Sequence, residues 1–408
     1  MARAEHESDP VRSMRFEKTV LQIIPTLDAG GAERSTLEMT RAIVDAGGKA
    51  IVATSGGRLV DDIEKAGGRV FKMPAASKNP VTMIANRGRL IRLMREEGVD
   101  LIHARSRAPA WSALLAARGA GVPFVATYHG AYEAGSPIKR LYNSAMARGD
   151  LVIANSEFTA ASVRRLYDVG DRLVVIPRGA DLEEFNPEAI SPARIRAIGE
   201  KWRLGEKKAR LVLLLPGRLT DWKGHEAAVR AAAALRNDAQ TGVFPEFQLI
   251  FAGDSQGRSG FAASLVRMVN ELGLKDVISA VGHCGDMPAA YALSDIVLSP
   301  STRPEAFGRV AAEAGAMGKV AIAAAHGGAM ETIEDGVTGF LAAPGSADAL
   351  TEALRKAAAL GADGRRAMGA KARARIAARY STRAMTEATL AAYQALLARM
   401  AARRSGAI

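Results

Sequence analysis

Two cations lie five residues apart on a glycine-containing loop. Arg218 and Lys223 fall between Pro216-Gly217 and Gly224, directly after an apolar run. Arginine suits bidentate contacts with oxygens and lysine acts as a point charge, so the pair could clamp a diphosphate. Solvated loop charges are the alternative, because most Lys and Arg side chains lie on protein surfaces.

Two carboxylates follow a later apolar run. Glu305 lies in a loop that contains proline, and Glu313 lies in a helix expected to begin near Gly308. Because the residues around Glu313 are small and apolar, we expect its carboxylate to be partly buried, and a buried carboxylate needs a partner. A sugar or ribose hydroxyl could be that partner, and an ion pair with Arg309 is the alternative.

Glycine pairs and histidines mark other strand ends. Gly30-Gly31 and Gly327-Gly328 each precede a helix, where backbone N–H groups could bind an anion. An ordinary strand-to-helix turn is the alternative, and the G-x-G-x-x-G dinucleotide fingerprint is absent. His129 and the Gly282-His283 pair end two further strands. A lone histidine in such a place is more often structural than functional.

Short apolar runs alternate with helix-length segments along the chain, which predicts parallel strands buried on both faces. We expect roughly six or seven strands before residue 180 and roughly six after residue 210, too many for one open sheet. The prediction is therefore an α/β protein with two facing, Rossmann-like, doubly wound domains and a ligand cleft between them. The expected parts are a polar tail over 1–18, a first domain over 19–185 joined by a C-terminal helix over 381–400, and a second domain over 186–380.

The composition is that of a globular protein. Of the 408 residues, 48% are hydrophobic and 24% charged, and the net charge is +12. The first residues are polar and the chain has no long apolar run, so we expect neither a signal peptide nor a membrane span. The expected location is therefore the cytoplasm. The lone Cys284 excludes a disulfide framework and a cysteine-based metal site. The positive charge could serve anionic lipid, nucleic acid or small anions, or only solubility.

The segment Glu305-Ala306-Phe307-Gly308, followed by Glu313, resembles the E-x-F-G-x-x-x-x-E signature of family 4 retaining glycosyltransferases of the GT-B fold. Four other motifs occur in the order found in that family, although Arg178-Gly179 replaces the family's usual N-G or H-G. They are Gly30-Gly31, Pro177–Asp181 with Phe185, the Arg218 and Lys223 pair, and Gly327-Gly328 with Glu331. The runs HARSRAPAWS and TYHGAY also resemble bacterial lipopolysaccharide-core mannosyltransferases.

The resemblance implies a role for each motif. The amides of Gly30 and Gly31 would contact the donor phosphate, and His129 would lie beside the reacting sugar. Arg218 and Lys223 would bind the diphosphate. The remaining implied contacts are Glu305 with the donor sugar, the amides of Ala306, Phe307 and Gly308 with sugar and phosphate, Glu313 with the ribose, and Gly282 and His283 with the base.

The resemblance also implies an activity. We expect a retaining glycosyltransferase that moves a hexose, with mannose from GDP-mannose as the first choice and a UDP-hexose as the next. The 19–185 domain would bind the acceptor, a glycolipid or polysaccharide such as lipopolysaccharide core, and the 186–380 domain the nucleotide-sugar. Neither a cofactor nor an essential metal is expected. The acceptor side would be electropositive, through His103–Pro109 with Lys139 and Arg140, and the basic surface could contact an anionic membrane.

Two other functions stay open on the sequence. A GT-B-fold nucleotide-sugar 2-epimerase would act on the donor without an acceptor. A non-catalytic protein could bind a nucleotide-sugar or a nucleic acid. Nucleic acid is not expected as a partner, because no basic platform interleaved with aromatic residues is found in the sequence.

Overall fold

The structure is a computed structural model, and it describes residues 15–28, 30–132, 135–204, 210–255, 257 and 259–405. The chain divides into two compact units, each described by itself below. Unit 1 comprises the chain up to Asn155, Ala160–Ile176 and the chain from Thr386 onward. Unit 2 comprises Ser156–Thr159 and Pro177–Met385.

Unit 1 is built on a seven-stranded sheet in the order β3-β2-β1-β4-β5-β6-β7, and every strand pairs in parallel. Its strands are short and mostly buried, as their apolar sequences predict. They are β1 (Thr19–Ile23), β2 (Lys49–Thr54), β3 (Arg69–Lys72), β4 (Leu101–Ala104), β5 (Phe124–Tyr128), β6 (Leu151–Ala154) and β7 (Leu173–Val175).

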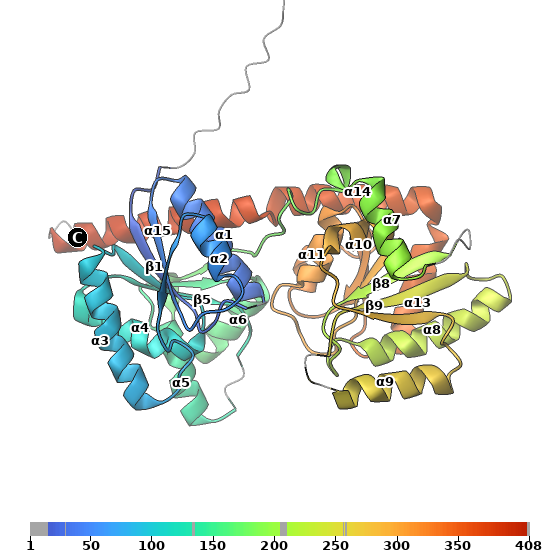
Figure 1. Cartoon of the computed structure of the whole chain (residues 1–408), viewed down its shortest axis with the longest axis horizontal. Coiled ribbons are helices and arrows are strands. Elements are labelled where there is room, and N and C mark those ends of the chain that lie inside the picture. Colours follow the sequence, from blue (N-terminus) through green and yellow to red (C-terminus); the bar gives the residue numbers. More distant parts are fainter. Residues whose placement is uncertain are drawn as a thin grey trace, which may run out of the picture. The chain divides into compact units, whose positions relative to one another are not determined.

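Helices cover both faces of this sheet, as expected for a doubly wound unit (Figure 1). The larger apolar core lies on the side of α3, α4 and α5, and a smaller one lies under α1 and α2. The helices are α1 (Gly31–Asp45), α2 (Val60–Lys65), α3 (Pro80–Glu96), α4 (Arg107–Ala120), α5 (Pro137–Ala147), α6 (Glu157–Leu166) and the 3-10 turn η1 (Gly170–Arg172). The first residues of α6, up to Thr159, group with unit 2.

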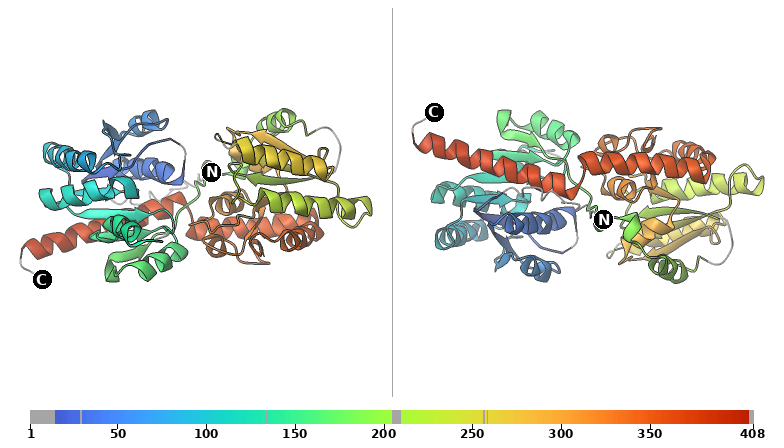
Figure 2. Two further views of the ribbon diagram at one scale, coloured as in Figure 1. Left: turned by 90° about the horizontal axis from the view of Figure 1, so that it is seen from below. Right: turned by 90° about the horizontal axis from the view of Figure 1, so that it is seen from above.

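The C-terminal helix α15 (Thr382–Arg404) completes unit 1. It lies along the elements of that unit in Figure 2. Its Tyr393 is fully buried and contacts the ring of His103 edge-on, with centroids 5.7 Å apart. From Thr386 onward the helix therefore belongs to unit 1.

Unit 2 has a six-stranded sheet in the order β10-β9-β8-β11-β12-β13, again parallel throughout. The two parallel sheets confirm the predicted α/β architecture. The strands are β8 (Leu211–Pro216), β9 (Phe247–Ala252), β10 (Ile278–Gly282), β11 (Ile296–Ser299), β12 (Val320–Ala324) and β13 (Gly339–Ala342).

The helices of unit 2 begin at the signals that the sequence offers. The N-cap Ser191 accepts a hydrogen bond from the amide of Arg194, and Asp286 does the same for Ala289, which satisfies N–H groups that the helix leaves open. The helices are η2 (Pro187–Ala189), α7 (Pro192–Lys201), α8 (His225–Gln240), α9 (Ser259–Glu271), α10 (Met287–Leu293), α11 (Arg309–Ala316), α12 (Ala329–Thr332), α13 (Ala347–Ala359) and α14 (Gly361–Arg379).

The segment after Ile176 packs with unit 2, earlier in the chain than the boundary placed at 185. The amide of Ala180 donates to the carbonyl of Tyr380 at 2.8 Å, and the amide of Thr382 donates to the carbonyl of Ala180 at 2.9 Å. Phe185 contacts the ring of Tyr291 at 5.8 Å between centroids. These long-range contacts, which sequence spacing does not reveal, hold Pro177–Phe185 to unit 2.

This close contact explains the glycine at 179. A Cβ atom there would overlap the backbone of Ser381 and Thr382. We therefore predict that Gly179→Ala lowers the free energy of unfolding of unit 2 by about 1–3 kcal/mol, measured by denaturant unfolding. Gly260→Ala in α9 of the same unit is the control, because a Cβ at Gly260 meets nothing within 4 Å. Equal stability of Gly179→Ala and the parent protein would contradict the steric account.

Candidate functional site

Four loops of unit 2 meet at the carboxyl edge of its sheet. The amide of Thr302, after β11, donates to the carbonyl of Trp222, after β8, at 2.8 Å. The amide of Gly328, after β12, donates to the carbonyl of Glu305 at 2.8 Å, and the amide of Leu219 donates to that of Asp254, after β9, at 3.0 Å. Since β9, β8, β11 and β12 are consecutive neighbours in the sheet, these bonds join their loops into one surface.

Two glycines make the approach of these loops possible. A Cβ on Gly224, which has φ +80°, would overlap the carbonyl of Pro300. A Cβ on Gly327, which has φ +64°, would overlap the backbone of Glu305. Both need a left-handed backbone and an empty Cβ position, so glycine is required.

Lys223 and Glu305 form the centre of this surface. The Lys223 Nζ lies 2.8 Å from the Glu305 Oε1, with the two side chains 15% and 17% exposed. The ammonium also lies 4.5 Å from the centroid of the Trp222 ring. Both residues are expected in a site from the sequence, and the structure adds that they pair with each other.

Glu305 has a second partner that the sequence analysis missed. The Ser301 hydroxyl donates to the Glu305 Oε1 at 2.5 Å, and the ring of His326 contacts the Ser301 carbonyl through Nε2 at 2.8 Å. Ser301 lies four residues before Glu305, a spacing that no motif marked. Together these contacts fix the carboxylate and, through it, the ammonium of Lys223.

The second carboxylate, Glu313, is partly buried as predicted and is also paired. Its Oε1 accepts from Arg309 at 2.6 Å and its Oε2 from the Tyr291 hydroxyl at 2.9 Å. The ion pair that the sequence analysis raised as the alternative is thus present, on a side chain only 12% exposed. Burial, together with the charge of Glu313, raises the pKa of Tyr291 well above its usual range.

The backbone around Phe307 supplies hydrogen-bond donors. Phe307 is buried, and Gly308 has φ +79° and forms the N-cap of α11. The first N–H groups of a helix lack partners within it and attract anions. The segment that follows Glu305, Ala306 to Gly308, therefore leads from the Lys223–Glu305 pair directly into the N-terminus of α11.

The remaining predicted residues of unit 2 lie on the same edge. Arg218 is exposed on the loop after β8. Gly282, with φ +70°, ends β10 and bridges to Gly253, and His283 is exposed beside it. Because β10 and β8 are separated by β9, Gly282 and His283 lie away from the Lys223–Glu305 pair.

Gly30, Gly31 and His129 belong to unit 1. Gly31 begins α1 and Gly30 is its N-cap. The carboxylate of Glu33 lies against Gly30, where it neutralises part of the helix dipole. His129 is half-buried after β5, so the structure keeps the predicted residues of unit 1 at the carboxyl ends of β1 and β5.

The expectation of an electropositive run over His103–Pro109 needs a correction. His103 and Arg105 are buried, 0% and 3% exposed, so they belong to the interior of unit 1 and not to its surface. The Arg105 guanidinium donates to the Gln22 Oε1 at 2.9 and 2.6 Å. The His103 ring contacts the hydroxyls of Tyr393 at 2.5 Å and Thr127 at 2.7 Å, and burial holds its pKa well below the usual range.

Within the described part of the chain, no group of three or more His, Cys, Asp or Glu residues could hold a metal ion. The single cysteine, Cys284, is buried. No helix among the described residues is long and apolar enough to cross a membrane.

Two doubly wound parallel sheets in one chain, with polar loops clustered at the carboxyl edge of the second, are the architecture of the GT-B class of glycosyltransferases. The model of Glycosyltransferase Family 4 matches residues 29–184, and that of Glycosyl transferases group 1 matches residues 199–375. The chain belongs to this glycosyltransferase family, and it is a transferase enzyme.

Curated relatives agree with this assignment. The chain is 32% identical over 386 residues to a D-inositol 3-phosphate glycosyltransferase of Xylanimonas cellulosilytica, covering 86% of this chain and 88% of the relative. It is 29% identical to a GDP-mannose-dependent alpha-(1-6)-phosphatidylinositol monomannoside mannosyltransferase of Mycolicibacterium smegmatis, covering 74% and 79%.

Solved structures show the same fold. A glycosyltransferase from Rickettsia africae superposes with a TM-score of 0.86 at 32% identity, covering 93% of this chain and 99% of that one. Anabaena HepE in complex with UDP and glucose gives a TM-score of 0.79 at 24% identity, covering 92% and 99%.

His225, which directly follows the loop of Lys223, makes the stability of unit 2 depend on pH. His225 begins α8, is fully buried, and contacts the Phe251 ring edge-on at 5.0 Å between centroids. Burial, helped by the charge of Lys223, lowers the pKa of His225 to about 4, whereas an unfolded histidine titrates near 6.5. Below about pH 6.5 the unfolded chain thus binds a proton that folded unit 2 does not, and stability falls as the pH falls.

We therefore predict that His225→Phe makes the loss of unfolding free energy between pH 7 and pH 5 smaller by about 2 kcal/mol. Chemical denaturation of unit 2 at both pH values measures it. His283→Gln, on an exposed histidine, is the control and should keep the parent's pH dependence. The same pH dependence in His225→Phe as in the parent would refute the assignment.

Proposed function

We propose that this glycosyltransferase is retaining and metal-independent, and that it transfers a hexose from a nucleotide-diphosphate sugar to an anionic polyol or glycolipid. The observation that carries the proposal is the Lys223–Glu305 pair at 2.8 Å, held by Ser301 and placed beside the N-terminus of α11. It combines a fixed cation, a fixed carboxylate and backbone donors at one sheet edge.

The chemistry follows from the leaving group. When the bond between the sugar C1 and the diphosphate oxygen breaks, the diphosphate takes the electron pair and the ring gains positive character. Lys223, Arg218 and the amides before α11 would stabilise the charge on the diphosphate. The acceptor hydroxyl would then bond to C1 on the face that the diphosphate leaves, and its proton would pass to a phosphate oxygen.

The two carboxylates would serve recognition. Glu305 would accept hydrogen bonds from sugar hydroxyls through its Oε2, because Lys223 and Ser301 both bind its Oε1. Glu313 would accept from the ribose with the lone pairs that Arg309 and Tyr291 leave. Gly282 and His283 would border the base. In unit 1, the amides of Gly30 and Gly31 would contact the donor phosphate and His129 would lie beside the sugar.

The donor and acceptor are proposed from the relatives. GDP-mannose is our first choice, supported by the name of the mycobacterial relative, and a UDP-hexose is the second, supported by the ligand of HepE. For the acceptor, a phosphorylated inositol follows from the Xylanimonas relative, and lipopolysaccharide core follows from the motif resemblance. Both are polyols that carry an anionic group, and either could lie at the inner face of the cytoplasmic membrane.

A thermal-shift panel with GDP-mannose, UDP-glucose and UDP-galactose identifies the donor. Turnover is then measured with inositol phosphate and with deacylated lipopolysaccharide core as acceptors, with and without EDTA. Transfer that is unchanged by EDTA is expected, because cations of the chain take the place of a metal on the diphosphate. Consumption of donor with no acceptor present would favour the 2-epimerase, and binding without any turnover a non-catalytic protein.

We predict that Lys223→Ala and Glu305→Ala each leave a folded protein whose transfer rate is about 100- to 1,000-fold lower, the size typical of losing a group that stabilises transition-state charge. Lys356→Ala and Glu352→Ala are matched controls, because this second Lys–Glu pair is 61% and 55% exposed on α13. Normal turnover in both site variants would remove the proposed site.

A further inference from the structure

Exposed apolar side chains in unit 1 gather on one layer of helices. Among the described residues of unit 1, all the large hydrophobic side chains that stand out in solvent lie on α3, α4 and α5. They are Val81 (76% exposed), Ile84 (66%), Leu115 (43%), Ile138 (81%) and Leu141 (59%). We name this set the α3–α5 face. Burying apolar groups is favourable, so their exposure together marks an interaction surface.

These side chains lie close together in space. Trp111 of α4 donates from Nε1 to the carbonyl of Tyr142 on α5 at 2.9 Å. The neighbouring Ser112 donates to the carbonyl of Met83 on α3 at 3.1 Å. One turn of α4 therefore contacts the turn of α3 between Val81 and Ile84 and the turn of α5 that follows Leu141. Figure 1 shows the three helices side by side on one face of the sheet.

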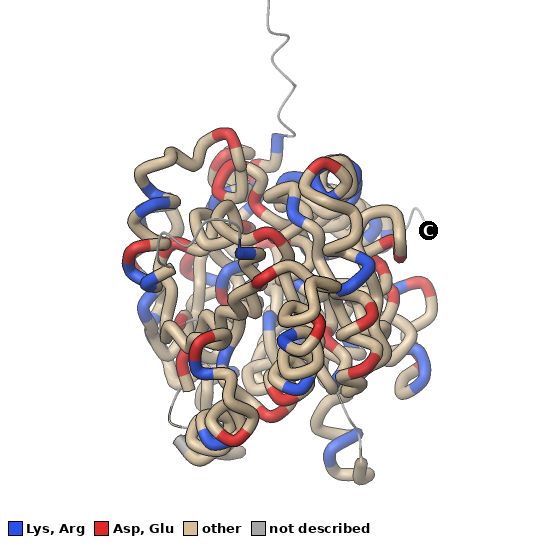
Figure 3. Tube along the Cα trace, turned by 90° about the vertical axis from the view of Figure 1, so that its right-hand side faces the viewer, with Lys and Arg blue, Asp and Glu red and all other residues tan. Residues whose placement is uncertain are grey.

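The three helices that carry the α3–α5 face, counted over their whole length, are almost entirely positive in charge. The three helices carry one acidic residue, Glu96, against eight basic ones: Arg87, Arg89, Arg92, Arg95, Arg107, Arg118, Lys139 and Arg140. Arg118 is paired with Asp150 at 2.9 Å. Figure 3 marks the Lys and Arg positions in blue and the Asp and Glu positions in red along the chain trace.

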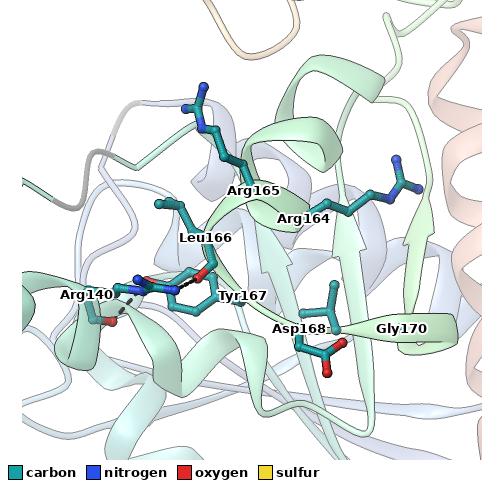
Figure 4. Close-up of a pocket in the computed structure, with 8 residues that line it drawn as sticks. Arg140, Arg164, Arg165, Leu166, Tyr167, Asp168 and Gly170 are labelled. Atoms are coloured by element: carbon teal, nitrogen blue, oxygen red, sulfur yellow. Dashed lines mark hydrogen bonds between the residues drawn. The ribbon is translucent and has the colours of Figure 1, made fainter.

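A basic pocket borders the α3–α5 face. Its volume is about 440 Å³, and three arginines line it with one acid, Asp168. Arg140 comes from α5 and donates to the carbonyl of Leu166 at 2.7 Å, and Arg164 and Arg165 extend from α6 (Figure 4). Guanidinium groups bind phosphate oxygens well. Figure 4 shows these three pointing in different directions, so they suit separate lipid phosphates at the edge of the apolar side chains.

We propose that the α3–α5 face docks onto an anionic phospholipid bilayer, with Ile138, Leu141, Val81 and Ile84 entering the interface and the basic residues contacting lipid phosphates. The inference rests on the proposed function, because a membrane-bound acceptor gives the docking its purpose. Apolar area and cations together are what peripheral binding to anionic lipid requires. The charge excess argues for this occupant, since a second copy of the same face would repel it.

Vesicle flotation of the full chain tests the proposal. The probes are two kinds of vesicle. One is phosphatidylcholine alone, and the other is phosphatidylcholine with about 30% phosphatidylglycerol, which gives a strongly negative surface. We expect binding to the anionic vesicles that weakens as salt is raised. Ile138→Ser with Leu141→Ser should reduce the bound fraction by about tenfold, and Lys139→Gln by roughly fivefold.

Val243→Ser with Val266→Ser is the matched control, because these valines of unit 2 are 72% and 56% exposed; this variant should bind vesicles like the parent. Thermal stability and the donor-induced thermal shift are measured for every variant. A variant that loses vesicle binding but keeps the donor-induced thermal shift supports membrane docking by the α3–α5 face. If the parent protein shows no donor-induced thermal shift, that result counts against the proposed function and not against the docking.

Three results would overturn the proposal: no binding of the parent protein to anionic vesicles at low salt, equal binding of the Ile138 and Leu141 variant, or self-association of the parent that this variant abolishes. The last would assign the face to contacts between copies of the chain.

Discussion

The ion pair between Lys223 and Glu305 is the interaction on which the account of the site depends. Withdrawing two charges from water costs free energy, and a partly buried pair persists only when its geometry and further hydrogen bonds offset that cost. Ser301 supplies one such bond to Glu305, and the Trp222 ring lies against the Lys223 ammonium. A pair held in this way presents a charge whose position is fixed before any ligand arrives, which is the condition for electrostatic stabilisation without reorganisation.

The rest of unit 2 can be understood as the framework of this pair. A parallel sheet brings the carboxyl ends of all its strands to one edge, and neighbouring strands then bring the loops after β8, β11 and β12 into contact. Glycine at 224 and 327 lets two of these loops approach to backbone contact. Unit 1 uses its cations differently, because Arg105 stabilises a buried polar layer while Lys139 and Arg140 face solvent.

Much of the fold follows from the sequence, because short apolar runs that alternate with helix-length segments indicate strands in a parallel sheet covered on both sides. The loops that carry chemistry could also be found, since Gly, Lys, Arg and Glu cluster after those strands. What the sequence could not give is which side chains meet. Tyr291 reaches Glu313 from a different helix, and Tyr393 reaches His103 across 290 residues. Such partners depend on packing, so His103 and Arg105 were assigned to the surface when they are buried.

A crystal structure of the full chain with its nucleoside diphosphate sugar bound tests the central claim most directly. The account predicts a diphosphate oxygen within about 3 Å of the Lys223 Nζ, the ordinary length of such a hydrogen bond, with the sugar hydroxyls on Glu305. A diphosphate bound elsewhere, with the Lys223–Glu305 pair untouched, would contradict it.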